Sequence, residues 1–218
     1  MFGRKPHYLK GGYMKSKQMV RVGILAALLA AMTVLPSDAS AQFLGQVSTA
    51  RSVDKGANDV GGFLGLYDQA MAIFGQYRRG FSRTADFGAF AGFIDPEGGS
   101  ARLTFGGDVK FQILDDQKSD PIDLALDSRV AFADYPGSFL FSFGESVVFS
   151  HDFNISSGSA LTPYGAVNLR IDHFSSDNNL EIAAVGGAKW EVSDLLDAYG
   201  ELVFDEDLGL VMGLNFKL

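Results

Sequence analysis

The residues of this sequence that could support catalysis are few, and the most suggestive of them are consecutive. Beyond residue 41 the chain has no cysteine and two histidines, His151 and His173. His151 stands between Ser150 and Asp152, so the residue types of a hydrolase triad occur side by side. Neighbouring residues of a strand point to opposite faces, and these side chains therefore cannot converge. We expect both histidines to lie near strand ends and the chain not to be an enzyme.

Two acidic turns are the candidates for a cation site. They are Asp115-Asp116 and Asp205-Glu206-Asp207. Neither has the ligand spacing of a dedicated calcium loop, and the absence of cysteine removes thiolate ligands. We expect solvated turns, with no bound metal and no cofactor.

The first 41 residues predict export from the cytoplasm. A basic region reaches Arg21, an apolar run follows from Val22 to Val34, and Ala39-Ser40-Ala41 offers small residues for cleavage. The run has about a dozen residues, whereas a membrane-spanning helix needs about twenty. We therefore expect a signal peptide over 1–41 and a mature protein that begins near Gln42.

The charge of the mature chain argues against binding to nucleic acid. Six of the 18 Lys and Arg residues precede Gln42, but only one of the 26 Asp and Glu residues does. The mature part is therefore strongly acidic, and it lacks the clustered basic residues that phosphate binding requires.

Alternation of apolar and polar residues with a period of two dominates the chain from about residue 84 onwards and predicts β-strands, whereas 58–67 and 69–79 are rich in glycine and alternate only in part. It is clearest in 207–218, where every second residue from Leu208 to Leu218 is apolar. Short turns separate the runs, so successive strands pair as antiparallel neighbours. We expect an all-β, up-and-down barrel of ten strands over 58–218, or eight if the first two fail, after an irregular leading segment at 42–57. The expected strands are 58–67, 69–79, 84–94, 100–114, 121–134, 138–152, 162–174, 180–192, 195–205 and 207–218.

The orientation of the two faces decides between a membrane barrel and a soluble, lipocalin-like barrel or sandwich. Several predicted strands have eleven to fourteen residues, which exceeds the usual five or six of soluble sheets and suits a tilted membrane crossing. We therefore expect the apolar faces to meet lipid and the polar faces to line a lumen. The ionisable residues expected in this lumen network are Arg102, Asp108, Lys110, Asp127, Arg129, Arg170, Asp172, Glu181, Lys189 and Glu201.

Glu145 does not fit this pattern. Strict alternation from Phe139 would direct its carboxylate towards lipid, where a charge is costly. We expect a β-bulge at Gly144 that turns Glu145 inward.

The last strand carries a resemblance to a known family. Its apolar residues Leu210, Met212, Leu214, Phe216 and Leu218 recur up to the last position, and the chain resembles the outer-membrane β-barrel proteins of Gram-negative bacteria. In that family such a strand resembles the assembly signal for the barrel-insertion machinery. Leu218 departs from the aromatic residue that the family most often has there. The resemblance implies outer-membrane lipid and the insertion machinery as partners.

A weaker similarity lies near the start of the barrel. The run from Gly75-Gln76-Tyr77 through Gly80-Phe81-Ser82-Arg83 to Asp86-Phe87-Gly88 looks like the strand–turn–strand of small uncharacterised barrels. We expect a structural or narrow pore and transport role, with a charged and largely filled lumen. The alternatives are an outer-membrane hydrolase of the lipid A deacylase or protease type, and a soluble periplasmic binding barrel.

Overall fold

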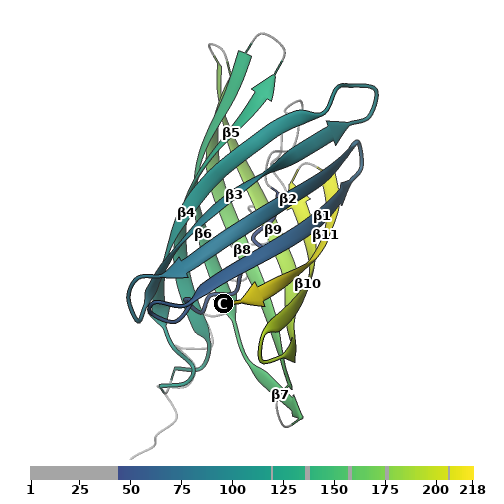
Figure 1. The fold of residues 1–218 in the computed structure, drawn as a ribbon. Helices are drawn as coiled ribbons and strands as arrows, with labels where there is room; N and C mark the ends of the chain where they lie inside the picture. Colours follow the sequence, from purple (N-terminus) through teal and green to yellow (C-terminus); the bar gives the residue numbers. More distant parts are fainter. Residues whose placement is uncertain (1–43, 119, 136–137, 157–158, 175–176, 206) are drawn as a thin grey trace, which may run out of the picture. The chain divides into compact units, whose positions relative to one another are not determined.

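Ten antiparallel strands close into a barrel (Figure 1). The computed structural model describes residues 44–218 except 119, 136–137, 157–158, 175–176 and 206, so the predicted signal peptide lies outside the described residues. The strands are β1 (Asn58–Tyr67), β2 (Ala70–Gly80), β3 (Ala85–Pro96), β4 (Arg102–Leu114), β5 (Asp123–Tyr135), β6 (Ser138–Ser150), β7 (Phe153–Ser156), β8 (Ser159–Phe174), β9 (Asp177–Ser193), β10 (Leu196–Asp205) and β11 (Asp207–Lys217).

Closure of the barrel depends on two strand pairings. β1 pairs with β11 from Asp59 opposite Lys217 to Tyr67 opposite Gly209, and β6 pairs with β8. The other strands of the wall pair with their neighbours in the sequence, as a meander requires. The four-residue β7 pairs with β8 and extends beyond the wall (Figure 1). No helix long and apolar enough to cross a bilayer occurs in the described residues.

The predicted fold class is confirmed, including the two least regular strands. β1 and β2 form ten consecutive pairs, from Asn58 opposite Arg79 to Tyr67 opposite Ala70, so the barrel has ten strands and not eight. The observed strand ends lie within three residues of the predicted ones. The structure adds β7, which the sequence pattern did not indicate because it is short and follows directly on β6.

The two faces of the wall differ sharply in polarity. In β6, Phe139, Phe141, Phe143, Val147 and Phe149 are all exposed on the outside. The alternate residues of the same strand are buried inside, among them Ser142, Ser146 and Ser150. This arrangement is the reverse of a soluble lipocalin-like barrel, whose apolar side chains fill the centre.

The expected bulge at Gly144 is wrong. β6 pairs without interruption with β5 along its whole length and with β8 from Leu140 to Ser150, so Glu145 faces outward and is exposed. The Ser128 hydroxyl on β5 donates a hydrogen bond of 2.7 Å to its carboxylate. That cross-strand partner offsets part of the cost of an outward charge, which is up to about 2–4 kcal/mol for the most costly residues at mid-bilayer.

Candidate functional site

The leading segment, which we define as residues 44–53, lies inside the barrel. Every residue from Leu44 to Ala50 is buried, although none of them belongs to a strand. This position within the lumen was not anticipated from the sequence. A segment that pairs with no strand must satisfy its backbone polar groups in another way, because water has little access to them.

Glu201 on β10 provides the innermost anchor for this segment. Its carboxylate accepts hydrogen bonds of 2.8 Å from the backbone N–H groups of Gln46 and Val47, and one of 2.7 Å from the Tyr164 hydroxyl. The backbone on either side of this site is unusual, because Gly45 and Val47 have positive φ angles of 99° and 37°. Two successive N–H groups that bind one carboxylate form a concave anion site. The backbone of Val47 is strained, because a residue other than glycine rarely adopts a positive φ.

Three further side chains of the wall hold the same part of the segment. Asp127 accepts a hydrogen bond of 2.6 Å from the Gln46 side-chain amide. The Arg129 guanidinium donates to the Gly45 carbonyl oxygen at 2.6 Å, and the Lys110 ammonium donates to the Thr49 carbonyl oxygen at 2.8 Å. The lumen therefore supplies an acceptor for backbone donors and cations for backbone acceptors, which is why the segment can be buried.

The contacts continue towards the start of β1. The backbone N–H of Val53 donates to the Asp86 carboxylate at 2.9 Å, and that of Ser52 donates to the Gln112 side chain at 3.1 Å. The N–H of Ala50 donates to the Ser150 hydroxyl at 3.2 Å. All these bonds link the segment to side chains of the wall and not to strand backbone. The segment is thus a separate insert that the wall side chains hold.

Arg51 holds the segment at the rim through a group of carboxylates. Its guanidinium lies 2.7 Å from Asp116, 3.2 Å from Asp123 and 2.5 Å from Asp152. Carboxylate oxygens of Asp115, Asp116 and Asp123 lie within 4.8 Å of one another, close enough to share a cation. Here the Arg51 guanidinium already supplies positive charge to two of them.

The turn beyond this group is open to solvent. Lys118 lies 2.7 Å from the Asp115 carboxylate, and its hydrogen bond holds the pKa of that carboxyl below the ordinary value. His151 Nδ1 lies 3.0 Å from Asp116, at the same rim. The predicted position of His151 next to a turn agrees with this geometry.

The consecutive residues Ser150, His151 and Asp152 do not form a catalytic unit in the structure. The Ser150 hydroxyl accepts a bond from the leading segment, while His151 contacts Asp116. Asp152 binds Arg51 and accepts a hydrogen bond of 2.6 Å from Thr162. Each of the three side chains has a different partner, because adjacent positions along the chain diverge.

Buried ion pairs connect β2, β3 and β4 on the inner face of the wall. Arg78 on β2 lies 2.7 Å from Asp86 on β3 and also binds Asp108 on β4. Lys110 lies 3.5 Å from the other oxygen of Asp86. Arg78, Asp86 and Lys110 are all nearly inaccessible to solvent, and their charges are matched by close partners.

A second network lies among β8 and β10. Arg170 lies 2.8 Å from Asp172 and 2.8 Å from Asp205, so one guanidinium joins two carboxylates. Lys217 at the end of β11 lies 3.0 Å from Asp197. The pairs Arg170–Asp205 and Lys217–Asp197, like those around Arg78, join different strands and brace the wall from within.

The structure places the residues of the expected lumen network in two groups. The buried ones, with at most 8% of their surface exposed, are Asp108, Lys110, Asp127, Arg129, Arg170, Asp172, Glu181 and Glu201. Arg102 and Lys189 lie nearer the strand ends and are half-buried. Arg102 stacks at 4.0 Å over the ring of Tyr135, and Lys189 lies 3.2 Å from Glu191. The residues of the expected C-terminal assembly signal, Leu210, Met212, Leu214, Phe216 and Leu218, are all exposed on the outside.

Sequence reasoning missed two parts of the lumen. One is Arg78, which alternation along β2 could have found, because it shares a face with Gln76 and Phe74. The other is an aromatic layer in which Phe63 stacks on Phe74 at 5.2 Å and contacts Tyr199 at 6.0 Å. The lumen is therefore filled by rings as well as by charges.

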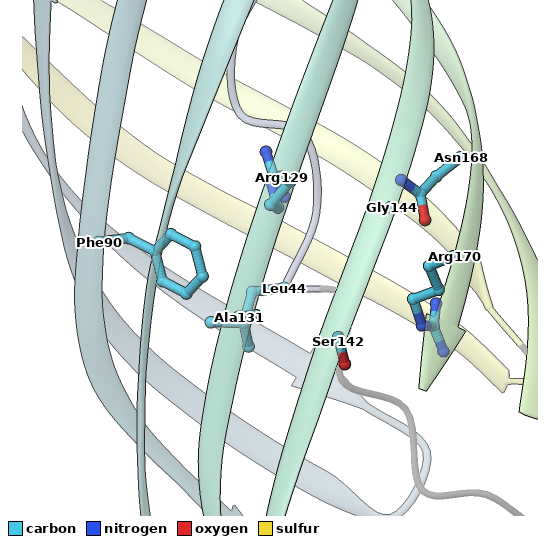
Figure 2. A pocket seen from close by; sticks show the side chains of 8 residues that line it. All are labelled: Leu44, Phe90, Arg129, Ala131, Ser142, Gly144, Asn168 and Arg170. Carbon is cyan, nitrogen blue, oxygen red and sulfur yellow. The ribbon is translucent and has the colours of Figure 1, made fainter. Parts of the chain in front are cut away.

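A small cavity lies at the inner end of the segment, next to Leu44 (Figure 2). Its lining is Leu44, Phe90, Arg129, Ala131, Ser142, Gly144, Asn168 and Arg170. Three buried polar atoms of this lining, Ser142 Oγ, Asn168 Oδ1 and Arg170 Nη2, have no hydrogen-bond partner among the described residues. Such atoms suit the binding of a small polar molecule, because a buried polar atom without a hydrogen bond costs free energy.

A closed antiparallel barrel with an apolar outside and a charged, hydrogen-bonded inside defines the class of transmembrane β-barrels. No protein-family model and no curated relative matches the chain. It resembles a designed transmembrane β-barrel at 15% identity, with 77% of this chain and 99% of the other covered and a TM-score of 0.39.

Two natural barrels are also similar to it. KdgM porin shares 4% identity, with 72% and 98% of the two chains covered and a TM-score of 0.41. The N-terminal β-barrel domain of OprF from Pseudomonas aeruginosa shares 9% identity, with 75% and 98% covered and a TM-score of 0.37. At these values the likenesses carry no argument about function, and the class rests on the geometry of the barrel itself.

Proposed function

We propose that this chain is an outer-membrane β-barrel whose narrow pore is kept closed by its own leading segment. The observation that carries the proposal is the burial of seven consecutive residues, 44–50, within the lumen. Glu201, Asp127 and Lys110 of the wall each bind that segment. A closed pore fits these contacts, because the segment takes the space and the polar groups that a passing solute would need.

The attachment of the segment favours a closable pore over a solid structural barrel. Its hydrogen bonds go to wall side chains, so it can leave without breaking the pairing of any strand. The wall that it would expose carries the cations Lys110 and Arg129 as well as acidic residues, but among the buried ionisable residues of the described barrel nine are acidic and four are basic. A lumen lined in this way would favour small cations or polar solutes.

Conductance in planar bilayers tests the closed pore. The intact protein should give no steady current steps, because the segment blocks the lumen. A variant that lacks residues 44–53 should conduct and should prefer cations. Heat-modifiability on gels shows whether that variant still forms a barrel. Steady steps from the intact protein would refute closure, and a folded variant that stays silent would show that the segment is not the gate.

An arginine on the outer face tests the membrane placement. Met212 lies in the middle of β11 and is exposed on the outside, so Met212→Arg would place a cation in hydrocarbon. We expect the barrel to lose about 2–4 kcal/mol of folding free energy in lipid vesicles, as measured by urea titration. Leu208→Arg, near the strand end, is the control and should cost at most about 1 kcal/mol. Equal effects of the two variants would contradict a lipid-facing exterior.

A further inference from the structure

Ser128 and Glu145 form a polar pair on the outer face of the barrel. They lie directly opposite each other on β5 and β6, and the serine hydroxyl donates to Glu145 Oε2 at 2.7 Å. Away from the strand ends, the other outward side chains of the described strands are aliphatic, aromatic, or those of glycine, alanine and proline. The only two outward polar residues at this depth among the described residues are therefore partners.

The pair lies deep in the apolar zone. Glu145 is the eighth of the thirteen residues of β6, and its outward neighbours Phe143 and Val147 are both exposed. With a rise of about 3.3 Å per residue and a tilt of about 40°, the two ends of β6 lie roughly 13 and 18 Å away along the barrel axis. This places the carboxyl group near the middle of an apolar band about 25 Å tall.

Ser128 fills only part of the hydrogen-bonding capacity of this carboxyl group. A carboxyl has two oxygens with about four acceptor sites, and the Ser128 hydroxyl occupies one of them. Hydrocarbon offers no hydrogen bonds, so the remaining sites need a polar group at the same depth. Within the described part of the chain, no other group donates to Glu145.

We propose that a second copy of this chain packs against this face in the membrane. The Glu145 face consists of Ser128, Glu145 and their exposed apolar neighbours Leu126, Val130, Phe143, Val147 and Leu169. A copy rotated by a twofold axis along the bilayer normal presents its own Ser128 and Glu145 at the same depth. Across such an axis, a Glu145 carboxyl group that carries its proton can donate a hydrogen bond to the carboxyl group of the other copy and accept one from it. The surrounding apolar side chains exclude lipid from the contact.

Disulfide crosslinking is a direct test, because the chain contains no cysteine. Val147→Cys places a single thiol on the Glu145 face. Leu64→Cys places one outward on β1, five strands away around the barrel in either direction. After oxidation in membranes, Val147→Cys should give a disulfide-linked dimer and Leu64→Cys should not. Equal crosslinking at the two positions, or none at either, would overturn the proposed contact.

Substitution of the carboxyl group separates a specific contact from random collision. In the Val147→Cys background, Glu145→Leu should lower the dimer fraction about tenfold, whereas Glu145→Gln, which keeps a donor and an acceptor, should retain most of it. A dimer fraction that Glu145→Leu leaves unchanged would refute the role of the polar pair.

The proposed dimer rests on the membrane placement, and the two can fail separately. Heat-modifiability and membrane fractionation of each variant report whether the barrel is folded in lipid. A folded barrel in the membrane that does not crosslink would refute the dimer alone. Recovery of the unmodified protein as a soluble monomer would refute the membrane placement.

Discussion

Replacing Gly45 by alanine should release the leading segment from the lumen. Gly45 has a φ of 99°, and a Cβ atom there would lie 2.2 Å from Glu201 Oε1. Glu201 would have to move, and it would then lose the backbone bonds from Gln46 and Val47. The positive φ adds about 1–2 kcal/mol for a residue with a side chain, and each lost bond to a buried donor adds about 1–3 kcal/mol.

The release should be visible in two measurements. Amide hydrogen exchange at Gln46 and Val47 should become faster by at least about tenfold, the factor that about 1.4 kcal/mol produces. In planar bilayers, the variant should show openings that the intact protein lacks. Unchanged exchange at both amides would contradict the role of Glu201 as the anchor.

Gly56→Ala is the matched control for this variant. Gly56 also has a positive φ, of 88°, but nothing lies within 4 Å of the Cβ that alanine would add. It therefore repeats the backbone strain of the first variant without the collision. We expect normal exchange at Gln46 and Val47 and no openings. Openings in both variants would attribute the release to backbone strain near β1 and not to the Glu201 contact.

The strands could be predicted because each one carries its own evidence. Residues 208–218 alternate without a break, and a period of two is enough to fix both the strand and its apolar face. Glu145 shows where this reasoning ends. Its position depends on Ser128, a residue of another strand, and the register that brings them together is not visible in either strand alone.

The side chains of the wall that line the lumen were predictable, but the segment that fills the lumen was not. Asp108, Lys110 and Glu201 follow from alternation, because an inward face is defined once the outward face is known. The leading segment has no period, and it is held largely through backbone N–H and C=O groups that every sequence has. Only Gly45, where the close approach of Glu201 leaves no room for a Cβ atom, gives a local hint.

The largest effect on the barrel itself is expected from Arg78→Met. Arg78 is buried and binds both Asp86 and Asp108, so its removal would leave two buried carboxylates without their closest cation. Breaking a buried ion pair by removing one partner costs about 3–5 kcal/mol. We expect a loss of this size in the free energy of unfolding, measured by urea titration in lipid vesicles.

Arg79→Met is the control, because it makes the same substitution at the next residue of the same strand. Arg79 faces outward near the end of β2 and is exposed, so its replacement should change stability by at most about 0.5 kcal/mol. Adding Asp108→Asn to Arg78→Met should recover part of the loss, since one unpaired charge is then removed. Equal losses for the two arginine variants would mean that the buried network contributes no more than any charge near the rim. In that case the wall would owe its stability to strand pairing and to the aromatic layer of Phe63, Phe74 and Tyr199.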